Sequence, residues 1–347
     1  MILPASYGRA ALALAIGAVG GWLFMLATMP LPWMLGSMAF CTAAAVFGAP
    51  IRAPVRIRPF MIVVVGIMLG AGYRPEILER AGEWLGSLSM LLVYVAVVGG
   101  AGLAYFRLFS RYDPVTSYFC AMPGGFNEMV MMGAEMGGDE RRIALTHASR
   151  VLLVVFAVPL WLRLTGQLDI ASRMGLGTAL ADVAPADYLL LAACAVGWPI
   201  AQKLRIPAAS LVGPMILSAI LHLGGLTESQ PPTVIVNLAQ LFIGTTVGCR
   251  FTGAGKREVG HALVVGAGLA VLMLALTALF AFAVEAIAGA PFPVAVLAFS
   301  PGGLAEMSLV GLALGVDVAF IATHHVARIF LVILLAPAVI RLWKWRN

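Results

Sequence analysis

Two apolar segments of this chain are each interrupted by Pro-Gly-Gly, with a glutamate three residues after the second glycine. The stretch from Met122 to Met129 recurs as the stretch from Ser300 to Met307. Proline cannot continue a helix and glycine tolerates any backbone angle, so each copy predicts a helix, a break and a new helix N-terminus. Lipid cannot satisfy bare backbone N–H groups. A break inside a membrane must therefore face protein or a wet cavity.

The composition places these breaks in a membrane. The chain has 347 residues, of which 61% are hydrophobic and 11% charged, whereas a soluble domain carries about 25% charged residues. The sequence therefore predicts an integral membrane protein. Its net charge of +6 fits basic cytoplasmic loops, and no basic run long enough to read nucleic acid occurs. The four cysteines lie far apart without a C-x-x-C pattern, which predicts buried apolar residues rather than a zinc site or disulfides.

The two halves of the chain repeat at a nearly fixed offset. From Gly66 onward the offset is 178 positions, and matched pairs include Asp139 with Asp317, beside the motif residues. Such a register indicates a duplicated unit. We assign 1–166 to repeat one, 167–185 to a linker and 186–347 to repeat two. The third apolar segment of each repeat carries G-x-x-x-G (Gly66/Gly70 and Gly244/Gly248), which permits close backbone packing.

The loop charges predict how the repeats cross the membrane. Each repeat holds six apolar segments, and a spanning helix needs about 20 residues. The basic loops fall on one side only if the fifth segment, which carries Pro-Gly-Gly, enters and leaves on the same side. We therefore expect an all-α protein with five transmembrane helices and one re-entrant helical hairpin per repeat. An odd number of crossings inverts repeat two relative to repeat one and leaves both termini cytoplasmic.

This pattern resembles a known family. The motif S-P-G-G-x-x-E-M, followed by a hydrophobic stretch, G-x-D and an arginine helix, is similar to that of the AbrB duplication membrane family, which has also carried the label ammonia monooxygenase. The first copy departs in having Met122 where the second has Ser300. The resemblance covers essentially the whole chain and implies a multi-pass protein of the bacterial inner membrane. The repeat logic is also similar to that of elevator-type carriers, which is a fold-level analogy.

The two breaks supply the candidate solute site. Each new helix begins with free backbone N–H groups, and the positive end of its dipole favours an anion; the alternative is a simple helix kink. Asn127 can donate to a solute, although its counterpart Ala305 cannot. The candidate substrate-binding residues at the breaks are Gly124, Gly125, Phe126, Asn127, Ser300, Gly302, Gly303 and Leu304.

Three pairs of ionisable residues accompany the breaks. Glu128 and Glu306 are candidates for carrying H⁺ or Na⁺, or they stabilise the helix N-terminus without any transport role. Arg150 and Arg328, inside the sixth segment of each repeat, either hold an anionic substrate or neutralise the two glutamates. His147 and His325 lie three residues earlier on the same helix face. They relay protons or make hydrogen bonds in the core.

These observations favour a secondary active transporter of a small organic anion, working by alternating access and coupled to H⁺ or Na⁺. The alternatives are a membrane regulator or receptor without transport, and a membrane oxygenase. No metal-binding motif and no cofactor motif occurs, so we expect no cofactor and no enzymatic activity. The expected partners are the solute, the coupling ion, the lipid bilayer and, by analogy with carriers, a second copy of the chain.

Overall fold

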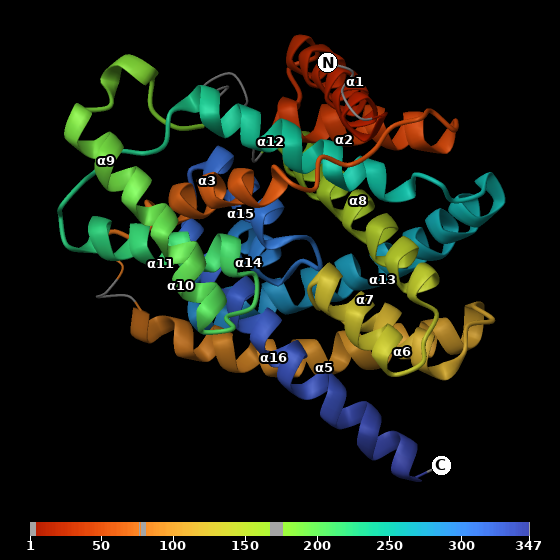
Figure 1. The fold of residues 1–347 in the computed structure, drawn as a ribbon. Helices are drawn as coiled ribbons and strands as arrows, with labels where there is room; N and C mark the ends of the chain where they lie inside the picture. Colours follow the sequence, from red (N-terminus) through yellow and green to blue (C-terminus); the bar gives the residue numbers. More distant parts are fainter. Residues whose placement is uncertain (1–4, 76, 78–80, 167–175, 347) are drawn as a thin grey trace. The chain divides into compact units, whose positions relative to one another are not determined.

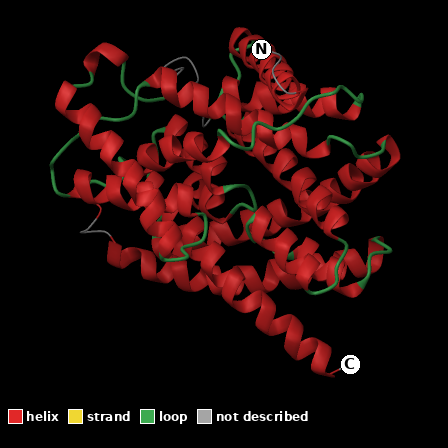
Figure 2. Ribbon diagram, in the orientation of Figure 1, coloured by secondary structure: helices red, strands yellow, loops and turns green. Residues whose placement is uncertain are grey.

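The computed structural model describes residues 5–75, 77, 81–166 and 176–346. These residues form helices joined by loops, with no strand among them (Figure 2). The all-α fold is therefore as predicted. Of the predicted linker, residues 167–175 lie outside the described part of the chain, and the remainder contains the 3₁₀ turn η2, Leu180–Asp182.

The helices follow one another as labelled in Figure 1. In the first half they are α1 (Ala5–Leu26), α2 (Pro32–Val46), α3 (Arg58–Gly70), η1 (Ala81–Glu83), α5 (Trp84–Phe109), α6 (Pro114–Ala121), α7 (Phe126–Glu135) and α8 (Glu140–Leu164). In the second half, after η2, they are α9 (Pro185–Ala193), η3 (Cys194–Val196), α10 (Gly197–Lys203), α11 (Ala209–Leu223), α12 (Thr233–Gly248), η4 (Cys249–Phe251), α13 (Lys256–Ala288), α14 (Phe292–Phe299), α15 (Leu304–Leu314) and α16 (Val318–Arg346).

Six of the described helices are long and apolar enough to cross a membrane. These stretches are Tyr7–Leu26, Trp84–Phe109, Glu140–Leu164, Thr233–Phe251, Lys256–Ala288 and Val318–Ile340. Four shorter apolar helices accompany them, namely α2, α3, α11 and α15. The chain is thus a helical membrane protein.

One predicted segment is divided. The apolar run over residues 186–202 predicts a single helix, but η3 separates α9 from α10. Pro199 has no N–H to donate to the carbonyl of Ala195, four residues earlier, so an α-helical bond is lost at this point. A short 3₁₀ turn tightens the chain there instead. The counterpart in repeat one, α1, has no such proline and is continuous.

The chain forms two compact units that cut across the repeats. The first consists of residues 1–82, 159–254 and 308–319, and the second of residues 83–158, 255–307 and 320–347. The first unit therefore contains α1–α3 and α9–α12, which are the opening helices of both repeats. The second contains α5–α7, α13 and α14, most of α8 and α16, and the first turn of α15, including both Pro-Gly-Gly breaks.

Within the first unit, the repeated glycines bring helices into close contact. A Cβ atom on Gly66 would collide with the backbone carbonyl of Leu211 in α11, and one on Gly244 would collide with the backbone carbonyl of Met34 in α2. A Cβ on Gly70 would collide with the backbone carbonyl of Met215, and one on Gly248 would collide with the side chain of Cys41 and the backbone carbonyl of Met38. Because Leu211 and Met34 occupy corresponding positions in the two repeats, the α3–α11 and α2–α12 contacts are reciprocal. The predicted close packing at the G-x-x-x-G motifs is confirmed.

Within the second unit, the corresponding helices α5 and α13 pack in antiparallel directions. The hydroxyl of Tyr94 lies 2.9 Å from that of Thr277. Farther along α5, the hydroxyl of Tyr105 donates to the carbonyl of Val265, 3.0 Å away and earlier in α13. The residue number therefore rises along one helix as it falls along the other. α5 also packs on the first break, because a Cβ on Gly99 would collide with the side chain of Met122.

Candidate functional site

The first Pro-Gly-Gly joins two short helices, which we call the first break segment (α6, the break and α7). α6 ends at Ala121, the chain becomes extended at Met122, and α7 begins at Phe126. α7 then returns along α6: Gly133 lies against Phe119, and the backbone N–H of Asp139 donates to the hydroxyl of Thr116 at 2.8 Å. The two helices are therefore antiparallel neighbours and form a helical hairpin (Figure 1).

The second break segment (α14, the break and α15) has the same order of elements. α14 ends at Phe299, Ser300 is extended with φ −59° and ψ 143°, and α15 begins at Leu304. The extended residue stops the α-helical bonding, so the last carbonyl groups of α14 need partners from elsewhere. The same is true of the last carbonyl groups of α6.

The two arginines donate to carbonyl groups at and just after these helix ends. The guanidinium of Arg150 donates through Nη1 to the carbonyl of Met122 at 2.9 Å and through Nη2 to that of Gly124 at 3.4 Å. The guanidinium of Arg328 donates to the carbonyls of Phe299 at 3.1 Å, Ser300 at 2.5 Å and Gly302 at 3.2 Å. Each cation thus lies at the negative end of the preceding helix, where its charge is favourable.

Neither arginine forms an ion pair with Glu128 or Glu306 in the described part of the chain. In this structure the two guanidinium groups bind backbone carbonyls instead. The sequence could not show this, because the competing acceptors are backbone carbonyls exposed by the break. Arg150 is 2% exposed and Arg328 3% exposed, so two positive charges are buried without a carboxylate beside them. In both residues the Nε atom is buried and makes no hydrogen bond to a described residue.

The two glutamates fold back onto the helix starts. A Cβ on Gly125 would collide with the carboxylate of Glu128, and one on Gly303 would collide with that of Glu306. Each carboxylate therefore lies over the glycine that precedes its helix, at the positive end of the helix dipole. Glu306 is buried, with 8% exposure, whereas Glu128 is partly exposed.

The two histidines bind the same short helices. Nε2 of His147 lies 2.9 Å from the carbonyl of Phe119, and Nε2 of His325 lies 2.9 Å from that of Leu297. The Nδ1 atom of His325 also lies 2.9 Å from a guanidinium nitrogen of Arg328. The geometry matches the hydrogen-bonding role that the sequence analysis gave as an alternative to proton relay.

Of the remaining predicted residues, Ser300 shows the clearest signature of a binding group. Its hydroxyl is buried and has no hydrogen-bond partner among the described residues. Gly302 and Leu304 are buried, Gly124, Gly125, Phe126 and Gly303 are partly exposed, and Asn127 is exposed. A Cβ on Gly124 would collide with Val332, one turn beyond Arg328 in α16. The first break therefore lies beside the helix that carries the arginine of the second.

Tyr94 is a buried residue beside the second break that the sequence did not indicate. This residue is fully buried in α5, its ring contacts Phe299 at a centroid distance of 5.3 Å, and its hydroxyl pairs with Thr277. A single tyrosine in an apolar helix carries no positional signal, because its role depends on the helices that surround it. Among the described residues, no group of three or more His, Cys, Asp and Glu side chains is placed to hold a metal ion.

The fold and this site define a polytopic helical membrane protein with two helix breaks in one compact unit. Residues 33–344 match the family described as "Transition state regulatory protein AbrB", so the chain belongs to the AbrB family. It is 30% identical over 352 residues to "Uncharacterized protein YhjN" of Bacillus subtilis (strain 168), covering 95% of this chain and 91% of the relative. It is 26% identical over 326 residues to "Putative regulator AbrB" of Escherichia coli (strain K12), covering 92% of this chain and 91% of the relative.

Proposed function

We propose that the protein is a secondary active transporter of a small organic anion, which works by alternating access. The observation that carries this proposal is the pair of buried guanidinium groups, Arg150 and Arg328, at two helix breaks of one compact unit. Charged groups inside a membrane protein are costly and are typical of solute or ion pathways. Here both are cations, and we propose that they favour a negatively charged solute once the coupling ion has neutralised Glu128 and Glu306 at the same breaks.

The solute class follows from the donors that lie near the breaks. The helix starts at Phe126 and Leu304 present the positive ends of two dipoles. The hydroxyl of Ser300 and the Nε atoms of both arginines are buried and have no hydrogen-bond partner among the described residues, and buried polar groups favour a ligand that satisfies them. A carboxylate or a similar small oxyanion has the acceptors for this set. We propose that these groups bind the anion, and that the hydrogen bonds from the arginine Nη atoms to the backbone carbonyls hold the guanidinium groups in position.

The architecture we propose is a pair of inverted repeats with two re-entrant hairpins. Three observations support it: the loop charges, the reciprocal glycine contacts of the first unit, and the antiparallel packing of the corresponding helices α5 and α13. Carriers with inverted repeats hold their solute near the bilayer midplane, between broken helices whose N-termini face it. The proposal includes cytoplasmic termini, a bacterial inner membrane and a homodimer.

Coupling to H⁺ or Na⁺ is part of the same proposal. Glu128 and Glu306 are the candidates for carrying the coupling ion, because their carboxylates lie at the two helix starts. His147 and His325 remain candidates for proton relay, although both contact a backbone carbonyl. We propose no enzymatic activity and no cofactor.

Flux measurements test the proposal directly. Purified protein in liposomes should accumulate at least one small carboxylate from a broad panel when a proton or sodium gradient is imposed. Ser300→Ala should lower that flux by about tenfold, since a lost hydrogen bond to a charged group corresponds to that factor, while Ser89→Ala, at an exposed serine of α5 outside the two breaks, serves as the matched control. No gradient-driven flux for any member of the panel would overturn the transporter.

The topology has its own test. Single cysteines at positions 141 and 317, in a cysteine-free background, should react with an impermeant reagent from opposite sides of the membrane. Labelling of both from one side would overturn the inverted repeats. A membrane regulator without transport remains the second candidate, because the name of the Escherichia coli relative includes the word regulator; solute binding without flux would favour it.

A further inference from the structure

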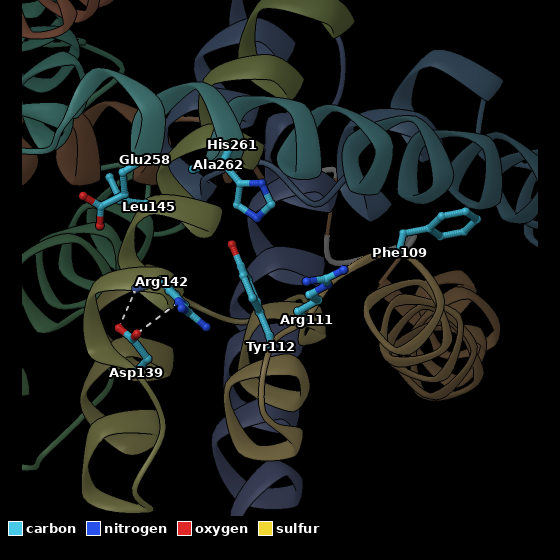
Figure 3. A pocket seen from close by; sticks show the side chains of 9 residues that line it. All are labelled: Phe109, Arg111, Tyr112, Asp139, Arg142, Leu145, Glu258, His261 and Ala262. Atoms are coloured by element: carbon cyan, nitrogen blue, oxygen red, sulfur yellow. Dashed lines mark hydrogen bonds and ion pairs between the residues drawn. The ribbon is translucent and has the colours of Figure 1, made fainter.

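One cavity of the second unit lies away from the helix breaks. It has a volume of about 610 Å³ and is lined by residues from the end of α5, the loop before α6, the start of α8 and the start of α13. Figure 3 shows Tyr112 in its centre, with its hydroxyl directed toward His261 of α13, and Arg111 beside it. Asp139 and Arg142 form the opposite wall. Pockets of about 300–1,000 Å³ are typical of small-ligand sites.

The acids of the cavity already have partners, and one cation does not. Asp139 pairs with Nε of Arg142 at 3.2 Å, and Glu258 pairs with Arg141 at 2.7 Å. Arg111 lines the cavity and has neither a hydrogen bond nor an ion pair to any described residue. The positive charge of Arg111 is therefore not balanced by a neighbouring carboxylate among the described residues, and the cavity favours an anionic ligand.

The other donors are held in place around that cation. The guanidinium of Arg142 lies over the ring of Tyr112, 5.1 Å from its centroid, which fixes the orientation of its Nη groups. The ring of Tyr112 also stacks on Phe106 at 5.7 Å and contacts His261 at 6.0 Å. Burial raises the pKa of the Tyr112 phenol, so its hydroxyl remains a donor at neutral pH.

We propose that this cavity binds a phosphate group, presented either by the headgroup of an anionic phospholipid or by a small phosphorylated solute. A phosphate has enough acceptor oxygens for two guanidinium groups and a phenol at once. The loops that meet here are rich in arginine and lysine, which the sequence assigns to the cytoplasmic side, and basic pockets between helices on that side bind anionic headgroups. Leu108 and Phe109, 76% and 72% exposed, offer an apolar border for acyl chains.

The test compares Arg111→Ala with Arg257→Ala. Arg257 is exposed in the first turn of α13 and does not line the cavity, so its replacement removes the same charge from the same region. Each purified protein is studied in nanodiscs of phosphatidylcholine with or without phosphatidylglycerol. Each is also titrated in detergent with inorganic phosphate and with a soluble phosphate monoester. The readouts are bound lipids by native mass spectrometry and the thermal unfolding midpoint.

For a lipid headgroup, the parent protein should retain phosphatidylglycerol and be stabilised by it. Arg111→Ala should weaken this binding by about tenfold, the effect of one charge-assisted contact, while Arg257→Ala should leave it nearly unchanged. For a soluble ligand, the same contrast should appear with phosphate or the monoester instead. If neither source binds, or if both variants lose binding equally, the proposed site is wrong. Because these experiments measure lipid and phosphate binding, their outcome does not depend on whether the protein transports a solute.

Discussion

The two break segments share a motif but differ in how the protein surrounds them. In the second, one guanidinium holds three carbonyls and a histidine, and the glutamate is buried. In the first, Arg150 holds two carbonyls, one of them at 3.4 Å, and Glu128 is partly exposed. The shared motif therefore specifies the break itself, and the neighbouring residues determine how many hydrogen bonds stabilise it. The second break has more hydrogen bonds and is more deeply buried than the first.

The largest expected effect comes from the arginines. Arg328→Ala leaves three carbonyls of the second break without a donor, whereas Arg150→Ala leaves two. Each buried acceptor left unsatisfied costs about 1–3 kcal/mol, so Arg328→Ala should destabilise the protein by more than about 3 kcal/mol and more than Arg150→Ala does. Thermal unfolding in detergent measures the difference. Equal losses would show that the extra hydrogen bonds of the second break contribute nothing.

A smaller effect is expected at the glycines that the glutamates cover. In Gly303→Ala, the new methyl group displaces the buried carboxylate of Glu306, and the crowding should cost about 1–3 kcal/mol. In Gly125→Ala, the partly exposed Glu128 can turn toward solvent, so the loss should stay below about 1 kcal/mol. The unfolding midpoints of the two variants test this order. A larger loss at Gly125 would reverse the comparison.

The starts of the two segments also differ. Asp113 caps α6 by accepting a hydrogen bond from the backbone N–H of Thr116 at 3.0 Å, while the corresponding residue before α14 is Pro291, which has no side-chain cap. Asp113→Ala should cost about 1 kcal/mol, and Asp113→Asn much less. Unfolding of both variants at neutral pH measures the cap. Similar losses in the two would show that the amide does not replace the carboxylate.

The same cap predicts a pH dependence. The pKa of Asp113 is lowered: burial opposes the ionised form, but hydrogen bonds from the side chain and backbone of Thr116 outweigh it. The stabilisation is therefore present above the unfolded-state pKa of about 3.9 and is lost as the pH falls below it. The stability difference between the parent protein and Asp113→Ala should shrink between about pH 5 and pH 3. If this stability difference stayed constant over that pH range, the ionised Asp113 cap would not be the source of the stabilisation.

The smallest effect is expected from Asn127→Ala. This side chain is exposed in the first turn of α7, and its counterpart in α15 is already alanine. Exposed substitutions away from special contacts change stability by about 0.5 kcal/mol or less. Unfolding should therefore barely change. A larger loss of stability would mean that Asn127 makes a stabilising contact at the first break. The difference in stabilisation between the two break segments would then be smaller than their hydrogen bonds indicate.

The sequence predicted the positions of the breaks and most helix bounds, because proline, glycine and apolar run length act locally. It predicted close packing at Gly66 and Gly244 for the same reason. It did not predict that Arg150 and Arg328 would donate hydrogen bonds to backbone carbonyls and form no ion pair with Glu128, because these contacts depend on distances between helices. The cavity around Tyr112 was equally hidden, because α5, α8 and α13 meet there only in the fold.

The reciprocal contacts of Gly66 and Gly244 have a consequence for how this chain can be assembled. Each seam joins a third helix of one repeat to a second helix of the other. Leu211, which Gly66 contacts, lies in the second half of the chain, and Met34, which Gly244 contacts, lies in the first half. Each half therefore lacks the partner of its own glycine, so neither half can form either contact without the other.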